Sequence, residues 1–141
     1  MKKIFVILLA TILLFSMVIP AYAALPDPPI SPQYKYINSY SVVLDINKSS
    51  GIASCSATCY ALDVDKVEIE IVYKLQRYTG SSWTTINTWT ASGTSYASLS
   101  KSATVSSGYT YRGKATYRVY DSAGNLLETG SATKTYSYPS P

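Results

Sequence analysis

Two cysteines four residues apart, Cys55 and Cys59, are the only thiols in the chain. In an oxidising compartment such a pair forms a disulfide, and two thiolates can also contribute to a metal site. In an extended strand, however, four residues span about 13 Å, whereas bridged Cα atoms lie roughly 4.4–6.8 Å apart. The chain also has no histidine to complete a metal site. We therefore expect two free, buried thiols and no disulfide, unless a bulge at residues 56–58 lets them meet.

The acidic residues do not form an evident catalytic pair. Asp63 and Asp65 flank one valine in a loop, while Glu68 and Glu70 share the outer side of the strand that follows. A glycosidase needs two carboxylates facing each other across a cleft, one with a raised pKa. Without histidine or a Gly-x-Ser-x-Gly motif, the chain also lacks the partner that activates a serine nucleophile. We expect no enzymatic activity and no cofactor.

Calcium is the alternative use for the loop carboxylates. Asp63 and Asp65 could share a calcium ion with Asp121 and Asn125 if their two loops converged, because calcium prefers hard oxygen ligands. The two loops lack the ligand spacing of a calcium-binding motif. We therefore predict no metal site.

The aromatic side chains are the remaining candidates for function. Trp83 and Trp89 bracket a run of threonine and asparagine, and six residues apart on a regular strand they share one face. That face is either core or an exposed platform that binds ligands at low entropic cost. We expect Trp83 to be buried and Trp89 to be the exposed anchor, with Tyr78, Tyr96 and Asn87 as further binding residues. Trp89→Ala would then weaken binding and spare the fold, whereas Trp83→Ala would destabilise it.

Residues 1–23 have the three-part order of a secretory signal peptide. Met1-Lys2-Lys3 is basic, residues 4–20 are apolar apart from one threonine and one serine, and Ala21-Tyr22-Ala23 is a small-x-small cleavage site. The apolar stretch is shorter than the roughly 20 residues of a membrane-spanning helix. We predict cleavage before Ala24 and a secreted, extracellular protein without a membrane span. No cell-wall sorting signal or lipobox cysteine is present, which favours release over anchoring.

The remainder divides into a proline-rich arm, a body and a short tail. Residues 24–33 contain four prolines, which favour extended backbone, residues 34–138 form the body, and residues 139–141 form the tail. Without the signal peptide the chain carries 10 basic and 8 acidic side chains. So small an excess gives no reason to expect nucleic acid or an anionic membrane surface as a partner.

The body alternates apolar and polar residues with a period of two, which is typical of half-buried strands. Turns rich in glycine, serine and asparagine separate the alternating segments, including a break predicted at residues 91–93. We expect strands at residues 34–46, 53–61, 67–75, 83–90, 96–105, 109–119 and 126–137. This pattern predicts an all-β fold, a single seven-stranded immunoglobulin-like (fibronectin type III-like) β-sandwich.

In that topology the third and sixth strands pair. The pairing would place Glu68 and Glu70 beside the basic side chains of the sixth strand, which are Arg112, Lys114 and Arg118. Each cross-strand ion pair of this kind contributes only about 0.2–1 kcal/mol. We therefore expect a solvated charged face here rather than an acid–base site.

Residues 105–111 (Val-Ser-Ser-Gly-Tyr-Thr-Tyr) resemble the turn into the sixth strand of a fibronectin type III module. Val105 is followed by Gly108 three residues later and by Tyr111 six residues later, which is the spacing of the tyrosine corner. Val105 and Ser107 stand where the family usually has leucine and proline. The resemblance implies that the Tyr111 hydroxyl bonds to nearby backbone.

The chain from about Tyr34 to Tyr136 also resembles an uncharacterised family of small secreted β-sandwich proteins from Gram-positive, clostridial-type bacteria. Three segments carry the resemblance: Ile-Ala-Ser-Cys-Ser-Ala-Thr at 52–58, the hairpin with Leu-Gln-Arg-Tyr at 75–78 and Trp-Thr-Thr-Ile at 83–86, and Ser-Ser-Gly-Tyr-Thr-Tyr-Arg at 106–112. The resemblance implies an exported bacterial β protein. It brings no activity with it.

Together these features predict a secreted, non-catalytic binding or surface-interaction module. The expected partner is a cell-envelope or environmental polysaccharide, or another protein. The alternative is an exported bacteriocin-like toxin acting on competing cells, which small size, export and richness in tyrosine and tryptophan also suit. Applying purified protein to lawns of related bacteria discriminates between the two, because a binding module leaves them growing.

Overall fold

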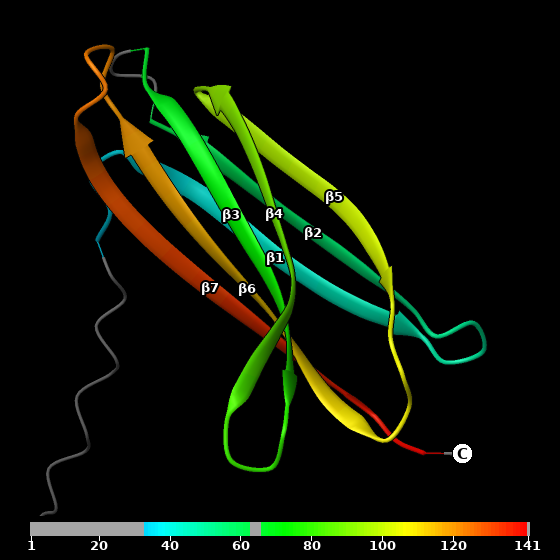
Figure 1. Ribbon diagram of the computed structural model, residues 1–141. Helices are drawn as coiled ribbons and strands as arrows, with labels where there is room; N and C mark the ends of the chain where they lie inside the picture. Colours follow the sequence, from blue (N-terminus) through cyan, green and yellow to red (C-terminus); the bar gives the residue numbers. More distant parts are fainter. Residues whose placement is uncertain (1–32, 63–65, 141) are drawn as a thin grey trace, which may run out of the picture. The chain divides into compact units, whose positions relative to one another are not determined.

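The computed structural model describes residues 33–62 and 66–140, which form an all-β domain of seven antiparallel strands in two facing sheets (Figure 1). The strand order is β1-β2-β5 in one sheet and β4-β3-β6-β7 in the other. The strands are β1 (Ile37–Asn47), β2 (Ile52–Ala61), β3 (Glu68–Tyr78), β4 (Trp83–Thr94), β5 (Tyr96–Thr104), β6 (Tyr109–Tyr120) and β7 (Leu126–Tyr138). The predicted seven-stranded β-sandwich is confirmed, and so is the pairing of the third and sixth strands.

Some sequence predictions concern residues outside this described part of the chain. They are the signal peptide at residues 1–23, the proline-rich arm up to residue 32, and the loop carboxylates Asp63 and Asp65. Among the described residues, no helix is long and apolar enough to cross a membrane.

The break predicted at residues 91–93 is wrong. These residues continue β4, paired with β3, and the chain turns two residues later at Ser95, whose φ is 59°. The Ser95 amide donates to the carbonyl of Val67, and its carbonyl accepts from Ala61, each at 2.9 Å. Gly93 is required for a different reason, because a Cβ there would collide with the carbonyl oxygen of Tyr96. One residue therefore carries the chain from one sheet to the other.

The core is built from small side chains on one sheet and large ones on the other. The inner face of β2 presents small side chains, all with 1% or less of their surface exposed: Ala53, Cys55, Ala57 and Cys59. The sheet opposite contributes Tyr73, Tyr111 and Tyr117, which are equally buried. Because both phenylalanines lie within residues 1–23, tyrosine supplies the bulk, and the small residues of β2 leave room for it.

Tyrosine hydroxyls also connect the two sheets. Four tyrosines of the four-stranded sheet donate to backbone carbonyls in or just after β1: Tyr73 to Val43, Tyr117 to Ser41, Tyr136 to Ile46 and Tyr138 to Lys48. A buried hydroxyl without a partner costs free energy, so each of these bonds allows a polar ring to replace phenylalanine. Many of the tyrosines are thus explained by their packing in the core or at its edge.

The buried thiols and hydroxyls make the domain sensitive to alkaline pH. Burial, with a smaller contribution from Glu128, raises the pKa of Cys59 from 9.0 to about 11. Burial likewise raises the pKa of Tyr73 and of Tyr117. Since the folded domain holds the Cys59 proton more tightly than the unfolded chain does, the stability that this thiol confers is complete below pH 9.0 and is lost as pH rises through about 11.

We therefore expect the free energy of unfolding in urea to fall between pH 9 and 11, with Cys59 alone contributing roughly 2–3 kcal/mol. The control is Cys59→Ala, which removes one titrating group and should show a smaller fall over the same interval. An equal fall in Cys59→Ala would contradict the assignment to this thiol. Urea titrations followed by circular dichroism at each pH make the comparison.

Candidate functional site

A β-bulge in β4 decides which aromatic side chains are exposed. Ile86 is an extra residue on β4 that has no partner between Leu75 and Gln76 of β3. An extra residue reverses the alternation of side chains between the two faces of a strand. Trp83 and Trp89 therefore lie on opposite faces of the sheet, and the prediction that they share one face is wrong.

Trp89 faces the core. It pairs with Tyr73, with the ring centroids 6.1 Å apart, and is partly buried against the core residues. Asn87, two residues before it and on the same side of the bulge, pairs with buried Leu75. The expectation that Trp89 is the exposed anchor of a platform is corrected here, because its ring is packed inward.

The other two predicted binding residues are exposed, but they lie far apart. Tyr78 is 38% exposed at the end of β3, where it enters the β3–β4 hairpin. Tyr96 is 43% exposed at the start of β5 in the other sheet, where its ring lies against Tyr60 with the centroids 4.5 Å apart. The β3–β4 hairpin and the β4–β5 turn lie at opposite ends of β4 (Figure 1). The four predicted residues therefore do not form one site.

Trp83 belongs to a different cluster, on the outer face of the four-stranded sheet at the β3–β4 hairpin. Its ring lies against Tyr78, with the centroids 5.2 Å apart, and the guanidinium of Arg112 lies 4.3 Å from its centroid. A cation over an aromatic face is an attractive arrangement. Arg112 Nε donates to Gln76 Oε1 at 2.7 Å, and Gln76 Nε2 donates to Thr85 Oγ1 at 2.9 Å. We call these five residues the tryptophan cluster.

The tryptophan cluster is held in place before any ligand arrives. Its members leave only 9% of Gln76 exposed, although that residue is on the outer face. The Tyr78 hydroxyl donates to the Gly80 carbonyl at 2.8 Å, which fixes the ring against the hairpin turn. Within the described part of the chain, the side chain of Arg112 makes one hydrogen bond, which goes to Gln76. Its remaining N–H groups are therefore available to a ligand.

Two lysines lie next to the tryptophan cluster on the same face. Lys74 and Lys114 are directly opposite each other on β3 and β6, and both are exposed. Like charges placed directly opposite in a sheet destabilise it. We call these residues the lysine pair. Their repulsion is a cost to the fold unless an anion lies between them.

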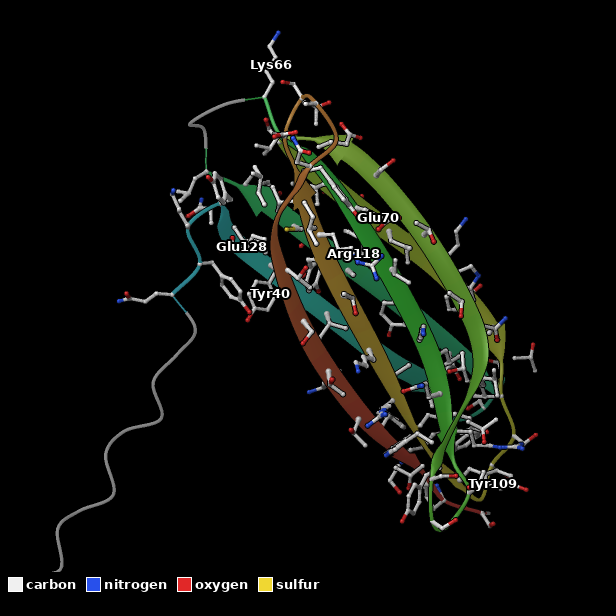
Figure 2. All side chains as sticks on the ribbon, turned by 60° about the vertical axis from the view of Figure 1, so that its left-hand side comes forward. Tyr40, Lys66, Glu70, Tyr109, Arg118 and Glu128 are labelled. Atoms are coloured by element: carbon white, nitrogen blue, oxygen red, sulfur yellow. The ribbon has the colours of Figure 1, made fainter. Side chains whose placement is uncertain are left out.

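The carboxylates of this face lie toward its other end. Glu70 accepts a hydrogen bond from Arg118 at 2.8 Å, and Figure 2 shows the two side chains meeting between β3 and β6. Glu68 lies two residues further from the hairpin on β3 and accepts a hydrogen bond from the Thr94 hydroxyl. The predicted neighbourhood of acidic and basic side chains is confirmed at Glu70 and Arg118. The hairpin half of the face carries uncompensated positive charge.

Asp121 and Asn125, which were considered above as calcium ligands and not adopted, bond to each other within a turn. Asp121 accepts a hydrogen bond from the Asn125 side chain at 2.9 Å and others from the backbone of the β6–β7 turn. These bonds, chiefly those from Asn125, hold the pKa of Asp121 below its usual value. Within residues 33–62 and 66–140, no three histidine, cysteine or acidic side chains come together as a metal site. Cys55 and Cys59 are both free and buried.

A cleft of about 530 Å³ lies at the end of the domain away from the β3–β4 hairpin. Its charged lining residues are Lys66 and Asp121. Asp121 is occupied by the turn, and Lys66 points away from the domain (Figure 2). The cleft therefore does not bring its two charged groups together.

No protein-family model and no curated protein matches the chain. The function has to be argued from the tryptophan cluster and the lysine pair. Sequence reasoning placed Arg112 on the correct face, through the pairing of the third and sixth strands. It missed the contact of Arg112 with Trp83, because that contact depends on the bulge at Ile86.

Proposed function

We propose that the protein is a secreted, non-catalytic binding module that holds a polysaccharide at the tryptophan cluster. The carrying observation is the stack of Tyr78, Trp83 and Arg112 on the outer face, in which Tyr78 is exposed and the other two side chains are half-buried. Hydrogen bonds fix Tyr78 and Arg112 in this arrangement. Rigid aromatic rings supply contact area at low entropic cost, and polar groups beside them orient a ligand. Fixed rings with hydrogen-bonding groups at their edge suit the alternating apolar and hydroxyl surfaces of a sugar chain.

Binding is favoured over catalysis by the chemistry of the cluster. Its polar groups are a guanidinium, an amide and the hydroxyls of threonine and tyrosine. The five residues of the cluster include no carboxylate, thiol or imidazole, the side chains that most often act as a general acid or base. A polar surface of this kind recognises a ligand without altering it.

The proposal includes export and a more specific fold class. We infer that the chain is released after cleavage before Ala24 and that its sandwich is of the fibronectin type III-like, immunoglobulin-like kind. The β3–β6 pairing supports this class, as does the Tyr111 hydroxyl, which donates to the Ser106 carbonyl at 2.8 Å as in a tyrosine corner. The chain would then be one of the small exported Gram-positive proteins that its sequence resembles.

The test is retention of the mature chain in native gels that contain a polysaccharide. Trp83→Ala should reduce retention about tenfold or more, as truncation of a central aromatic anchor does in other interfaces. The matched control is Tyr96→Ala, which removes an exposed aromatic ring from the other sheet and should leave retention unchanged. Retention that is insensitive to Trp83→Ala, or equally sensitive to Tyr96→Ala, would overturn the proposed site.

A further inference from the structure

We infer that the polysaccharide is acidic and that the lysine pair and Arg112 bind its negative groups. This inference rests on the proposed function, since it names the class of polymer held at the tryptophan cluster. It starts from a feature that the fold itself does not explain. Lys74 and Lys114 are placed directly opposite each other, where their charges repel.

Positive charge and aromatic surface are continuous on this part of the sheet. Arg112 is two residues from Lys114 on β6, so both side chains project from the outer face. Arg112 pairs with Gln76, and Tyr78 follows two residues later on β3. We call this surface, which runs from the lysine pair past Arg112 to Tyr78 and Trp83, the track. It spans about 13 Å along the strands, because Lys74 and Tyr78 are four residues apart. An extended polymer lying on it would meet the cations first and the rings next.

Positive and negative side chains are unevenly distributed between the two halves of the face. At the hairpin half, the lysine pair and Arg112 have no carboxylate beside them among the described residues. At the far half, Glu68 and Glu70 are present, and Glu70 neutralises Arg118. Negative groups of a ligand are thus attracted to one half of the face only. Carboxylate and sulfate groups both match this charge.

The flanking strands favour a sugar chain over a single-stranded nucleic acid. Threonines of β4 and β7 border the track, and their hydroxyls can bond to sugar hydroxyls: Thr85, Thr88, Thr133 and Thr135. Proteins that bind single strands instead offer successive aromatic rings, on which one base after another stacks. Here the aromatic rings of the track, Tyr78 and Trp83, are grouped at one end.

The test compares each acidic polysaccharide with its uncharged counterpart. Polygalacturonate and dextran sulfate should bind the mature chain, whereas methyl-esterified polygalacturonate and dextran should bind at least about tenfold more weakly. Affinity for the acidic forms should also fall as salt concentration rises, because salt screens exposed charges. Calorimetric titrations at two ionic strengths give both comparisons.

The decisive variant is Lys74→Gln/Lys114→Gln. It should weaken binding of the acidic polymers about tenfold or more, and its melting temperature should stay unchanged or rise because a repulsion is removed. The matched control is Lys48→Gln/Lys101→Gln, which removes the same charge from the residue after β1 and from β5, both in the other sheet's half of the domain. This control should bind as the unchanged chain does.

Each contrary result has a defined meaning. Equal binding of the uncharged polymers, with no effect of Lys74→Gln/Lys114→Gln but a loss with Trp83→Ala, overturns the acidic polymer and leaves the proposed function standing. Absence of binding to all four polymers overturns both. Tighter binding of a single-stranded oligonucleotide than of either acidic polymer identifies nucleic acid as the partner and also overturns the inference.

Discussion

Gly113→Ala should lower the free energy of unfolding by about 3–5 kcal/mol. A Cβ on Gly113 would overlap the hydroxyl of Tyr73 and lie 2.5 Å from its Cζ. Tyr73 has no exposed surface, and its hydroxyl donates to the Val43 carbonyl at 2.8 Å. The ring can make room only by giving up that bond. Overpacking costs about 1–3 kcal/mol, and a buried polar group left without a partner costs a similar amount.

Urea unfolding of a double-mutant cycle tests this prediction. Tyr73→Phe removes the hydroxyl nearest to the new methyl group, so the combined variant should be less destabilised than the two single effects together. Gly80→Ala serves as the control for glycine replacement, because no atom lies within 4 Å of its Cβ position. Its φ of +95° leaves only the backbone strain, about 1–2 kcal/mol. Simple additivity at residues 73 and 113 would contradict the proposed collision.

Trp89→Ala should destabilise the domain by about 2–4 kcal/mol, whereas Trp83→Ala should cost less than about 1 kcal/mol. Truncating a fully buried tryptophan costs about 3–5 kcal/mol, and Trp89 is partly buried against Tyr73 and the core. Trp83 packs only on the outer face, against Tyr78 and Arg112. This order is the reverse of the one predicted from the sequence, which had Trp83 buried and Trp89 exposed.

Unfolding followed by circular dichroism compares the two variants without relying on tryptophan emission. Deleting Ile86 is the companion experiment, because it would remove the bulge and return the two tryptophans to one face. A deletion variant that is as stable as the unchanged domain, or Trp83→Ala more harmful than Trp89→Ala, would show that the bulge does not set the two environments.

The strands were predictable because their signal is local. Alternation within β2 and β3 is visible in the sequence itself, and the structure buries the expected residues, such as Cys55, Cys59, Ile69 and Ile71. The hydrogen bond of Tyr111 to Ser106 was also predictable, since a short spacing of residues carries it. The β4–β5 turn was predicted at the wrong residues. Gly93 is needed because the backbone of Tyr96 passes close to it, but in the sequence it looks the same as a glycine in a turn.

The candidate site was predictable only in part. Sequence reasoning selected tryptophan as the functional residue type and the strand from Trp83 to Thr90 as its place. It took Trp89 for the outward-facing ring, because Thr84, Thr85 and Ile86 give no sign that one of them has no partner on β3. Arg112 and the lysine pair lie at the site because of the register between β3 and β6. This register cannot be read from the sequence of either strand alone.

The amino-acid sequence by itself determined the seven strands, their inner and outer faces over regular stretches, and a core that relies on tyrosine. These follow from alternation and composition, which act within a few residues. The tertiary structure alone decided that Trp83 is outside and Trp89 inside, that Arg112 lies over Trp83, and that Lys74 faces Lys114. A bulge and a strand register arise when two distant segments pair, so their outcome depends on both strands together.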